Sequence, residues 1–174
     1  SLYKKLTPVL GSTVEAETAI IYEWESRWAF ETSMGMPNRD GAYENNCVDH
    51  YEPFVKMSIP VDVLNSEKDL SKYKLVIAPI LFMLRPGMSD KLKKFVENGG
   101  TLVMTYLSAM VNDTNLCYLD GFPGDGLRKV FGVWNEENDC LNSDEHRSVN
   151  ITAEGRKFGL SSDSFKADYV CAVL

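Results

Sequence analysis

At 174 residues, the chain is long enough for one domain with a sizeable core. Its 44% apolar and 25% charged residues are typical of a globular protein. The formal net charge of −7 disfavours nucleic acid as a partner, because phosphate binding needs a concentrated lysine and arginine surface. No apolar run approaches the roughly 18 to 20 residues that cross a bilayer. We therefore expect a cytoplasmic protein without a membrane partner.

The cysteines form no recognisable metal-binding pattern. They contain no C-x-x-C pair, and no histidine stands at metal-ligand spacing from them. We expect reduced, partly buried thiols, no metal and no cofactor. The four residues are Cys47, Cys117, Cys140 and Cys171.

The first third of the chain alternates between strand and helix patterns. Thr18–Trp24 is a short run of apolar, β-branched and aromatic residues, which is typical of a strand covered on both faces. A helix is expected to begin near Glu25. Tyr43–Met57 follows as a second helix, which Pro53 should kink or shorten. Its predicted apolar stripe comprises Cys47, Tyr51, Phe54 and Val55.

The next segment contains the clearest pattern in the sequence. Ile59–Leu64 and Lys74–Leu81 are predicted strands, and the second is almost continuously apolar, as in the centre of a parallel sheet. A helix then ends at Gly99-Gly100, and Thr101–Leu107 follows as another strand. We expect 74–81 and 101–107 to be adjacent, parallel and central. The buried stripe of the helix comprises Met88, Leu92, Phe95 and Val96.

This element order predicts an α/β protein with three layers, helix, sheet and helix, around a mainly parallel sheet. Beyond Ser108 the pattern is weaker. We expect one helical turn before a strand from Val133, and then a solvated acidic stretch. A hairpin is expected around Glu154-Gly155, and Ala167–Leu174 is the last predicted strand.

Two glutamates at the end of the first strand raise the possibility of a catalytic pair. Glu23 and Glu25 are about 7 Å apart along an extended chain, near the separation that inverting glycosidases use. Any E-x-E on a strand has this spacing, however. The first turn of a helix also favours carboxylates, which is a simpler explanation. On that helix Arg27 and Glu31 are four apart and are expected to pair.

Other chemistries lack the residues they need. The loop after the first strand is bulky and acidic, so it would repel the phosphate of a flavin nucleotide. The turn at Tyr106–Ala109 has neither a cysteine nor a G-x-S-x-G elbow. His50 and His146 stand in no recognisable triad pattern, and Cys117 lies too far along the chain to be the missing nucleophile.

Several segments, in order and spacing, resemble the middle domain of glycoside hydrolase family 42 β-galactosidases. The resemblance covers about residues 14–141 and resumes in the last predicted strand. The motifs that carry it are YEWESRWAFE, a Met36-Pro37-Asn38 turn, IPVDVL, DLSKYKLVIAP, FVENGGTLVMTYLS, GFPG and FGVW.

The resemblance implies a class I glutamine amidotransferase-like (flavodoxin-like) fold without the amidotransferase site, and association of subunits as a homotrimer. Residues 1–13 would be the end of a linker from a preceding barrel domain, which is a further partner. Residues 14–174 would form the trimerisation domain, truncated at its C-terminus. The family's catalytic glutamates lie on the barrel, so no catalytic residue carries over to this chain.

Two hypotheses for function follow. The first is a non-catalytic oligomerisation domain, whose candidate interface residues are Trp24, Arg27, Trp28 and Phe30, since aromatic residues and arginine are enriched at interface cores. The tryptophans could instead fill the domain's own core. The alternative function is an independent small-molecule hydrolase or amidotransferase-like enzyme, which would need a nucleophile and a base after Thr105.

Overall fold

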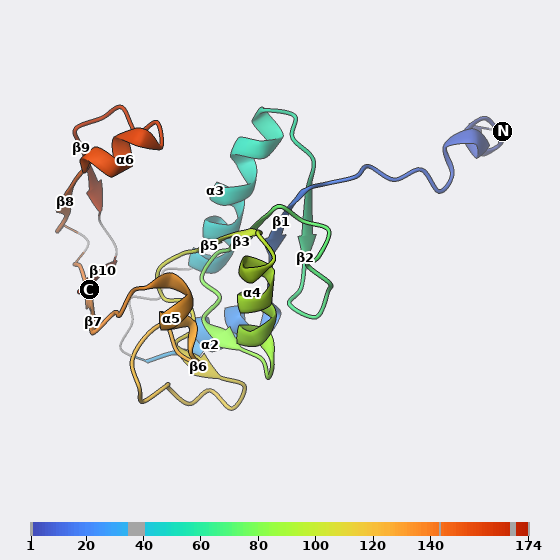
Figure 1. Cartoon of the computed structure of the whole chain (residues 1–174). Coiled ribbons are helices and arrows are strands. Elements are labelled where there is room, and N and C mark those ends of the chain that lie inside the picture. The colour runs from blue at the N-terminus through green and yellow to red at the C-terminus, as the bar shows by residue number, and fades with distance from the viewer. Residues whose placement is uncertain (1, 35–40, 143, 168–169, 174) are drawn as a thin grey trace.

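A four-stranded parallel sheet lies at the centre of the described part of the chain (Figure 1). Its strands are β1 (Thr18–Ile21), β2 (Val61–Leu64), β3 (Leu75–Ala78) and β5 (Thr101–Met104), in the order β2-β1-β3-β5. All the neighbouring pairs run parallel. With helices packed against this sheet, the α/β class predicted from the sequence is confirmed.

The computed structural model describes residues 2–34, 41–142, 144–167 and 170–173. The Met36-Pro37-Asn38 turn expected from the sequence lies outside the described residues. Three positions of the last predicted strand, Asp168, Tyr169 and Leu174, also lie outside them. Val170–Val173, within that predicted strand, forms β10.

Strands β3 and β5 are parallel neighbours, with Leu75 opposite Thr101 and Ala78 opposite Met104. This part of the prediction is confirmed. The central position predicted for β5 is wrong, because β5 is the last strand of the sheet in the described part of the chain. The next strand, β6 (Val111–Asn112), pairs instead with β4 (Met83–Leu84), outside the main sheet.

The helix between β3 and β5 is α4 (Met88–Glu97), and it ends as the sequence predicts. Gly99 has a φ of 90°, a left-handed conformation that favours glycine. The Gly100 N–H donates to the Phe95 carbonyl at 3.0 Å. A Cβ at Gly100 would lie 2.3 Å from the Phe95 ring, so a residue larger than glycine would clash at this position. The buried apolar residues of α4 are Met88, Leu92 and Phe95.

Helices pack on both faces of the sheet. On one face, Ile21 of β1 and Val76 of β3 share a buried cluster with Leu92 of α4. The other face is covered by α3 (Ala42–Lys56), which contacts β1 and β2. Helix α2 (Trp24–Thr32) packs between α3 and β4. The layered arrangement follows from the alternation of side chains along each strand.

Only the first half of α3 is buried as predicted. Of the predicted stripe, Cys47 is buried, whereas Tyr51, Phe54 and Val55 are not. The reason is length, since fifteen helical residues extend about 22 Å, whereas four strand residues extend about 13 Å. The end of α3 therefore passes beyond the sheet. Pro53 lies inside the helix, which ends three residues later.

The acidic segment contains a strand, which the sequence did not predict. β7 (Glu137–Cys140) pairs antiparallel with β10. Its Asn138 and Cys140 are partly buried, while Glu137 and Asp139 are exposed. Backbone pairing therefore places the acidic side chains on the solvent side of a strand. The strand expected from Val133 is instead a single bridge between Phe122 and Asn135, and the helical turn before it is α5 (Leu127–Phe131).

The expected hairpin is present in part. β8 (Arg147–Asn150) and β9 (Ser164–Ala167) pair antiparallel, but α6 (Ala153–Lys157) lies between them. The turn predicted at Glu154-Gly155 is wrong, because Thr152 caps a helix there. Its Oγ1 accepts from the Gly155 N–H at 3.2 Å.

Two segments of the described chain lie away from the sheet. The unit of β8, α6 and β9 stands apart from it in Figure 1. Near the N-terminus, α1 (Leu2–Lys5) and η1 (Thr7–Val9) lie at the far end of an extended segment that leads into β1 (Figure 1). The parallel sheet and its helices therefore hold the residues from which a functional site can be built.

Candidate functional site

Helix α2 separates its side chains into an inner and an outer face. Ser26, Ala29 and Phe30 point inward and are buried. Trp24 and Trp28, one turn apart, lie on the other side with 51% and 58% of their surface exposed. Two large apolar side chains are thus left exposed, one turn apart, on a helix whose inner face is buried.

The two exposed tryptophans and two partly buried neighbours form an ordered cluster. We call it the aromatic surface, and its residues are Tyr22, Trp24, Arg27 and Trp28. The rings of Trp24 and Trp28 are 6.1 Å apart between centroids, and Tyr22 meets Trp24 edge-on at 5.2 Å. The Arg27 guanidinium lies 5.3 Å from the centre of the Trp24 ring, within cation–π range. These contacts connect the two indoles to each other and to Tyr22 and Arg27.

Arg27 also connects α2 to α3. Its Nε donates to Glu31 Oε1 at 2.9 Å, and its Nη2 pairs with Glu44 of α3. The hydrogen bond to Glu31 raises the pKa of the Arg27 guanidinium above its usual range. The Arg27–Glu31 pair predicted from the sequence is confirmed, but the Glu44 contact depends on tertiary packing and has no local sequence signal.

Phe30, the fourth predicted interface residue, lies in the core. It is 1% exposed and meets Phe82 edge-on at 5.7 Å between ring centroids. It has no accessible surface to offer a second subunit, so we withdraw it from the interface. The α-helical period explains this position, because Phe30 follows Ser26 by four residues on the inner face. For Trp24, Arg27 and Trp28 the interface stays a prediction.

The two glutamates are part of a charged network that fixes the start of α2. Glu23 is 3% exposed and accepts hydrogen bonds from the N–H and the hydroxyl of Ser66. The Arg85 Nε lies 2.6 Å from Glu25 Oε2 and 3.8 Å from Glu23 Oε1. It also pairs with Glu67. The hydrogen bond to Glu25 raises the pKa of Arg85.

This arrangement favours a structural role for the glutamates. Glu23 has its carboxylate occupied by Ser66, and its own N–H donates to the Tyr43 hydroxyl at 2.8 Å. Burial raises the pKa of Tyr43 above its usual range, so this hydroxyl stays neutral. Sequence reasoning missed Arg85, although it follows β4 directly, at a strand end, where a charged residue is informative.

Among the described residues, no nucleophile and base come together at the end of β5. The Ser108 hydroxyl accepts from the Leu81 N–H at 3.1 Å, and Thr105 Oγ1 accepts from the Ile80 N–H at 2.8 Å. His50 has its Nδ1 2.7 Å from the Asn46 carbonyl of its own helix. In the part of the chain that the structure describes, neither histidine is hydrogen-bonded to Ser108. The site that the alternative enzyme hypothesis needs is not assembled here.

The same strand end borders an apolar cavity of about 350 Å³. Leu107 and Ala109, both with a φ of 55°, turn the chain sharply after β5. Its large apolar and aromatic lining residues include Met104, Tyr106, Leu107, Met110, Phe122 and Phe131. In a parallel sheet, this is the edge where binding sites occur.

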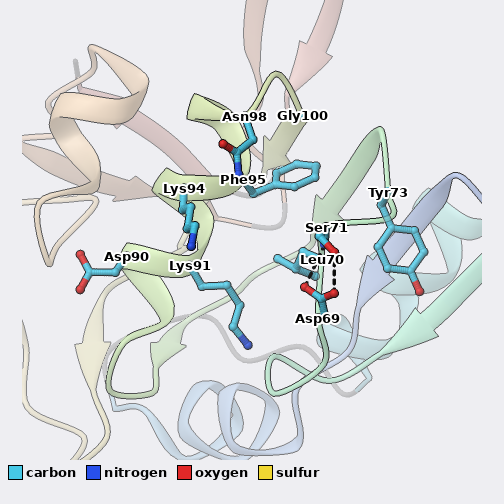
Figure 2. Close-up of a pocket in the computed structure, with 10 residues that line it drawn as sticks. All are labelled: Asp69, Leu70, Ser71, Tyr73, Asp90, Lys91, Lys94, Phe95, Asn98 and Gly100. Atoms are coloured by element: carbon cyan, nitrogen blue, oxygen red, sulfur yellow. Dashed lines mark hydrogen bonds between the residues drawn. The ribbon is translucent and has the colours of Figure 1, made fainter.

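A second cavity, of about 420 Å³, lies between the β2–β3 connection and α4 (Figure 2). Figure 2 shows Asp69, Ser71 and Tyr73 on one side and Lys91 and Lys94 on the other. Hydrogen bonds from the Ser71 hydroxyl and N–H lower the pKa of Asp69. Acidic and basic groups are mixed here, so the groove has no clear preference for one ligand charge.

Cys47, Cys117 and Cys140 are free, as the sequence predicts. Cys47 is buried and Cys140 is partly buried, but the burial expected for Cys117 is wrong, because this residue is exposed. Burial raises the pKa of the Cys47 thiol to about 12. Within residues 2–34, 41–142, 144–167 and 170–173, no group of three histidine, cysteine, aspartate or glutamate residues is placed to hold a metal ion. The described helices include none that is long and apolar enough to cross a membrane.

Comparisons with known proteins agree with one another. The family model described as the β-galactosidase trimerisation domain matches residues 16–170. β-Galactosidase Pbg of Clostridium perfringens is 43% identical over 173 residues, which is 99% of this chain and 25% of that protein. β-Galactosidase BglY of Alicyclobacillus acidocaldarius is 42% identical over the same shares.

Solved structures give the same result. The crystal structure of β-galactosidase from Rahnella sp. R3 matches with a TM-score of 0.87 and 46% identity, over 99% of this chain and 25% of that one. The enzyme from Bacillus circulans sp. alkalophilus matches with a TM-score of 0.85 and 35% identity, over 98% and 25%. The chain thus spans about a quarter of the length of these relatives, and it belongs to the β-galactosidase trimerisation domain family of glycoside hydrolase family 42.

Proposed function

We propose that this chain is the non-catalytic oligomerisation domain of a β-galactosidase that works as a homotrimer. Its family and its similarity to a quarter of several β-galactosidases support this proposal. Hydrolysis of terminal β-D-galactosides would then belong to a barrel domain of the longer polypeptide. The cytoplasmic location and the amidotransferase-like fold name stay predictions.

We further propose that Trp24, Arg27 and Trp28 form part of the subunit contact. The observation that carries this is the exposure of two indoles on a helix whose inner face is fully packed. About half of the surface of each tryptophan is exposed, so together they can bury roughly 250 Å². That is about a third of the ~800 Å² that each partner buries in a standard interface.

Light scattering of Trp24→Ala and Trp28→Ala variants tests the contact. The experiment uses the 174-residue chain and the longer polypeptide that carries it, over a dilution series. We expect at least tenfold weaker association of the longer polypeptide, because buried aromatic anchors commonly contribute about 2 kcal/mol or more. Phe158→Ala, which truncates an exposed ring on the β8–β9 unit, is the control and should leave assembly unchanged.

Association that is unchanged in both tryptophan variants would remove them from the interface. An activity assay separates the domain from the enzyme. The 174-residue chain should not hydrolyse a chromogenic β-galactoside, whereas the longer polypeptide should. Turnover by the short chain that is lost in a Ser108→Ala variant would support the alternative of an independent hydrolase.

A further inference from the structure

We propose that the apolar cavity at the end of β5 receives the Trp28 side chain of a neighbouring copy of this chain. The inference rests on the proposed function, because it needs a second copy as the partner. It assigns a second surface to the contact and pairs it with the aromatic surface of α2.

The cavity has the composition of a receptor for an aromatic ring. Two methionines, Met104 and Met110, line it together with Phe122 and Phe131. Methionine side chains are flexible and polarizable, so they adapt to an inserted ring and make favourable sulfur–aromatic contacts. None of the residues that line the cavity comes from α2. The tryptophans of the same copy therefore do not contribute to its wall.

Trp28 is the better candidate of the two indoles. Trp24 contacts Tyr22, Arg27 and Trp28, whereas among the described residues the ring of Trp28 contacts only that of Trp24. Trp28 is also the more exposed, at 58%. Of the two indoles, Trp28 therefore has fewer contacts within its own subunit to give up on entering a cavity.

The polar groups of the two partners are also complementary. An indole has one N–H donor and no acceptor. Asn135 lines the cavity, and its Oδ1 is buried without a hydrogen-bond partner among the described residues. A buried acceptor of this kind is costly unless a donor reaches it. The Asn135 Nδ2 donates to Asn138 Oδ1 at 2.8 Å, so Oδ1 is the atom of this amide that still needs a partner.

Cyclic symmetry requires two different surfaces on each copy, and the aromatic surface and the cavity meet this requirement. In a cyclic trimer each interface is heterologous, so a surface of one copy meets a different surface of the next. The aromatic surface projects from α2, and the cavity is built from the segment after β5, the Phe122-Pro123 turn, α5 and β10. A projecting surface and a recess on separate elements can close such a ring.

Photo-cross-linking tests the pairing directly. Trp28 is replaced by p-benzoylphenylalanine, a bulky aromatic residue that reacts with nearby C–H bonds, in the longer polypeptide. Isotopically labelled and unlabelled copies are mixed so that adducts between copies can be recognised. We expect adducts between copies at Met104 or Met110. The same replacement at Phe158 is the control and should give no adduct at these methionines.

A charge at the cavity mouth gives an independent test. Val133 lines the cavity and is exposed, so Val133→Asp should fold normally and weaken association at least tenfold. Leu119→Asp, on an exposed loop outside the cavity lining, is the matched control. In a mixture of the two variants, the Val133→Asp copy keeps its Trp28 and the Trp28→Ala copy keeps its cavity. Native mass spectrometry should therefore show mixed dimers at concentrations where each variant alone is monomeric.

The outcomes separate this inference from the proposed function. Trimers whose adducts map to α2 of the second copy, to another domain or to no cavity residue would overturn the cavity pairing and leave the oligomerisation function intact. A longer polypeptide that stays monomeric at every concentration would overturn both. Adducts at the cavity together with mixed dimers would support the pairing.

Discussion

Helices α2 and α4 are of similar length and both carry large apolar side chains, but they place them differently. In α4 the apolar residues Met88, Leu92 and Phe95 are all buried against the sheet. In α2 the buried positions hold Ser26, Ala29 and Phe30, while two tryptophans remain exposed. The large apolar side chains Met88, Leu92 and Phe95 of α4 therefore serve only the internal packing of the fold. In α2, two large side chains lie outside the core, and they belong to the subunit contact that we propose.

The largest effect expected from this comparison is on α4. Leu92 has no exposed surface, so Leu92→Ala should leave a cavity and lower the free energy of unfolding by about 2–5 kcal/mol. Urea denaturation followed by circular dichroism measures the change. Lys93→Ala, on the exposed side of α4, is the control. A loss below about 1 kcal/mol for Leu92→Ala would contradict the close packing described for this side.

A smaller effect is expected at the anchor of α2. Glu23→Gln should lower the free energy of unfolding by about 1–3 kcal/mol, because the buried hydrogen bonds from Ser66 lose their charged acceptor. Glu25→Gln, at a more exposed carboxylate, should have a smaller effect. Equal losses in the two variants would show that burial of Glu23 does not matter for stability.

The aromatic surface should matter little for the stability of one copy. Trp28→Ala should change the free energy of unfolding by about 1 kcal/mol or less, which is the scale of a single aromatic pair. The measurement is made at concentrations where the 174-residue chain is monomeric. A loss as large as that of Leu92→Ala would place Trp28 in the core and remove the contrast between the two helices.

The smallest effect is a pH-dependent one at the edge of the sheet. Hydrogen bonds from Lys72, at 2.8 Å, and from the Tyr73 hydroxyl, at 2.7 Å, lower the pKa of Asp62 below its ordinary 3.8. A carboxyl group whose pKa is lower in the folded than in the unfolded protein stabilises the folded protein at pH values above its unfolded-state pKa. This stabilisation is lost as the pH falls through the folded-state pKa. Asp62→Asn should therefore cost a few tenths of a kcal/mol at about pH 7 and less at about pH 2.5.

Urea midpoints of the unsubstituted protein and the Asp62→Asn variant at both pH values measure this difference. In a Lys72→Met background the pH-dependent part should shrink, since the main partner of Asp62 is gone. A stability difference between the unsubstituted protein and the variant that grows as the pH falls would have the wrong sign for this ion pair.

The parts of the fold that sequence reasoning predicted well are those set by local rules. The stripe of α4 and the glycines after it specify a helix and its end, whatever lies around them. The apolar run of β3 likewise predicts a strand buried on both faces. The parallel pairing of β3 and β5 then follows from the short connection between them.

The errors occur where distant segments decide the structure. Strand β7 is stabilised by backbone pairing with β10. The acidic side chains of this segment therefore did not indicate a strand. The exposure of Tyr51 and Val55 depends on where the sheet ends, which the pattern of α3 does not contain. For the candidate site, the helical period separates Trp24 and Trp28 from Phe30, but burial of Phe30 depends on Phe82, which is far from it in the sequence.

The tight connection from α4 to β5 limits how this domain can vary in length. Only Asn98, Gly99 and Gly100 separate the helix from the strand, and the second glycine already touches the Phe95 ring. One inserted residue would shift the register of β5 by one position and move its core-facing side chains to the opposite face. Insertions should therefore be tolerated at the exposed residues 113–116 and not between α4 and β5.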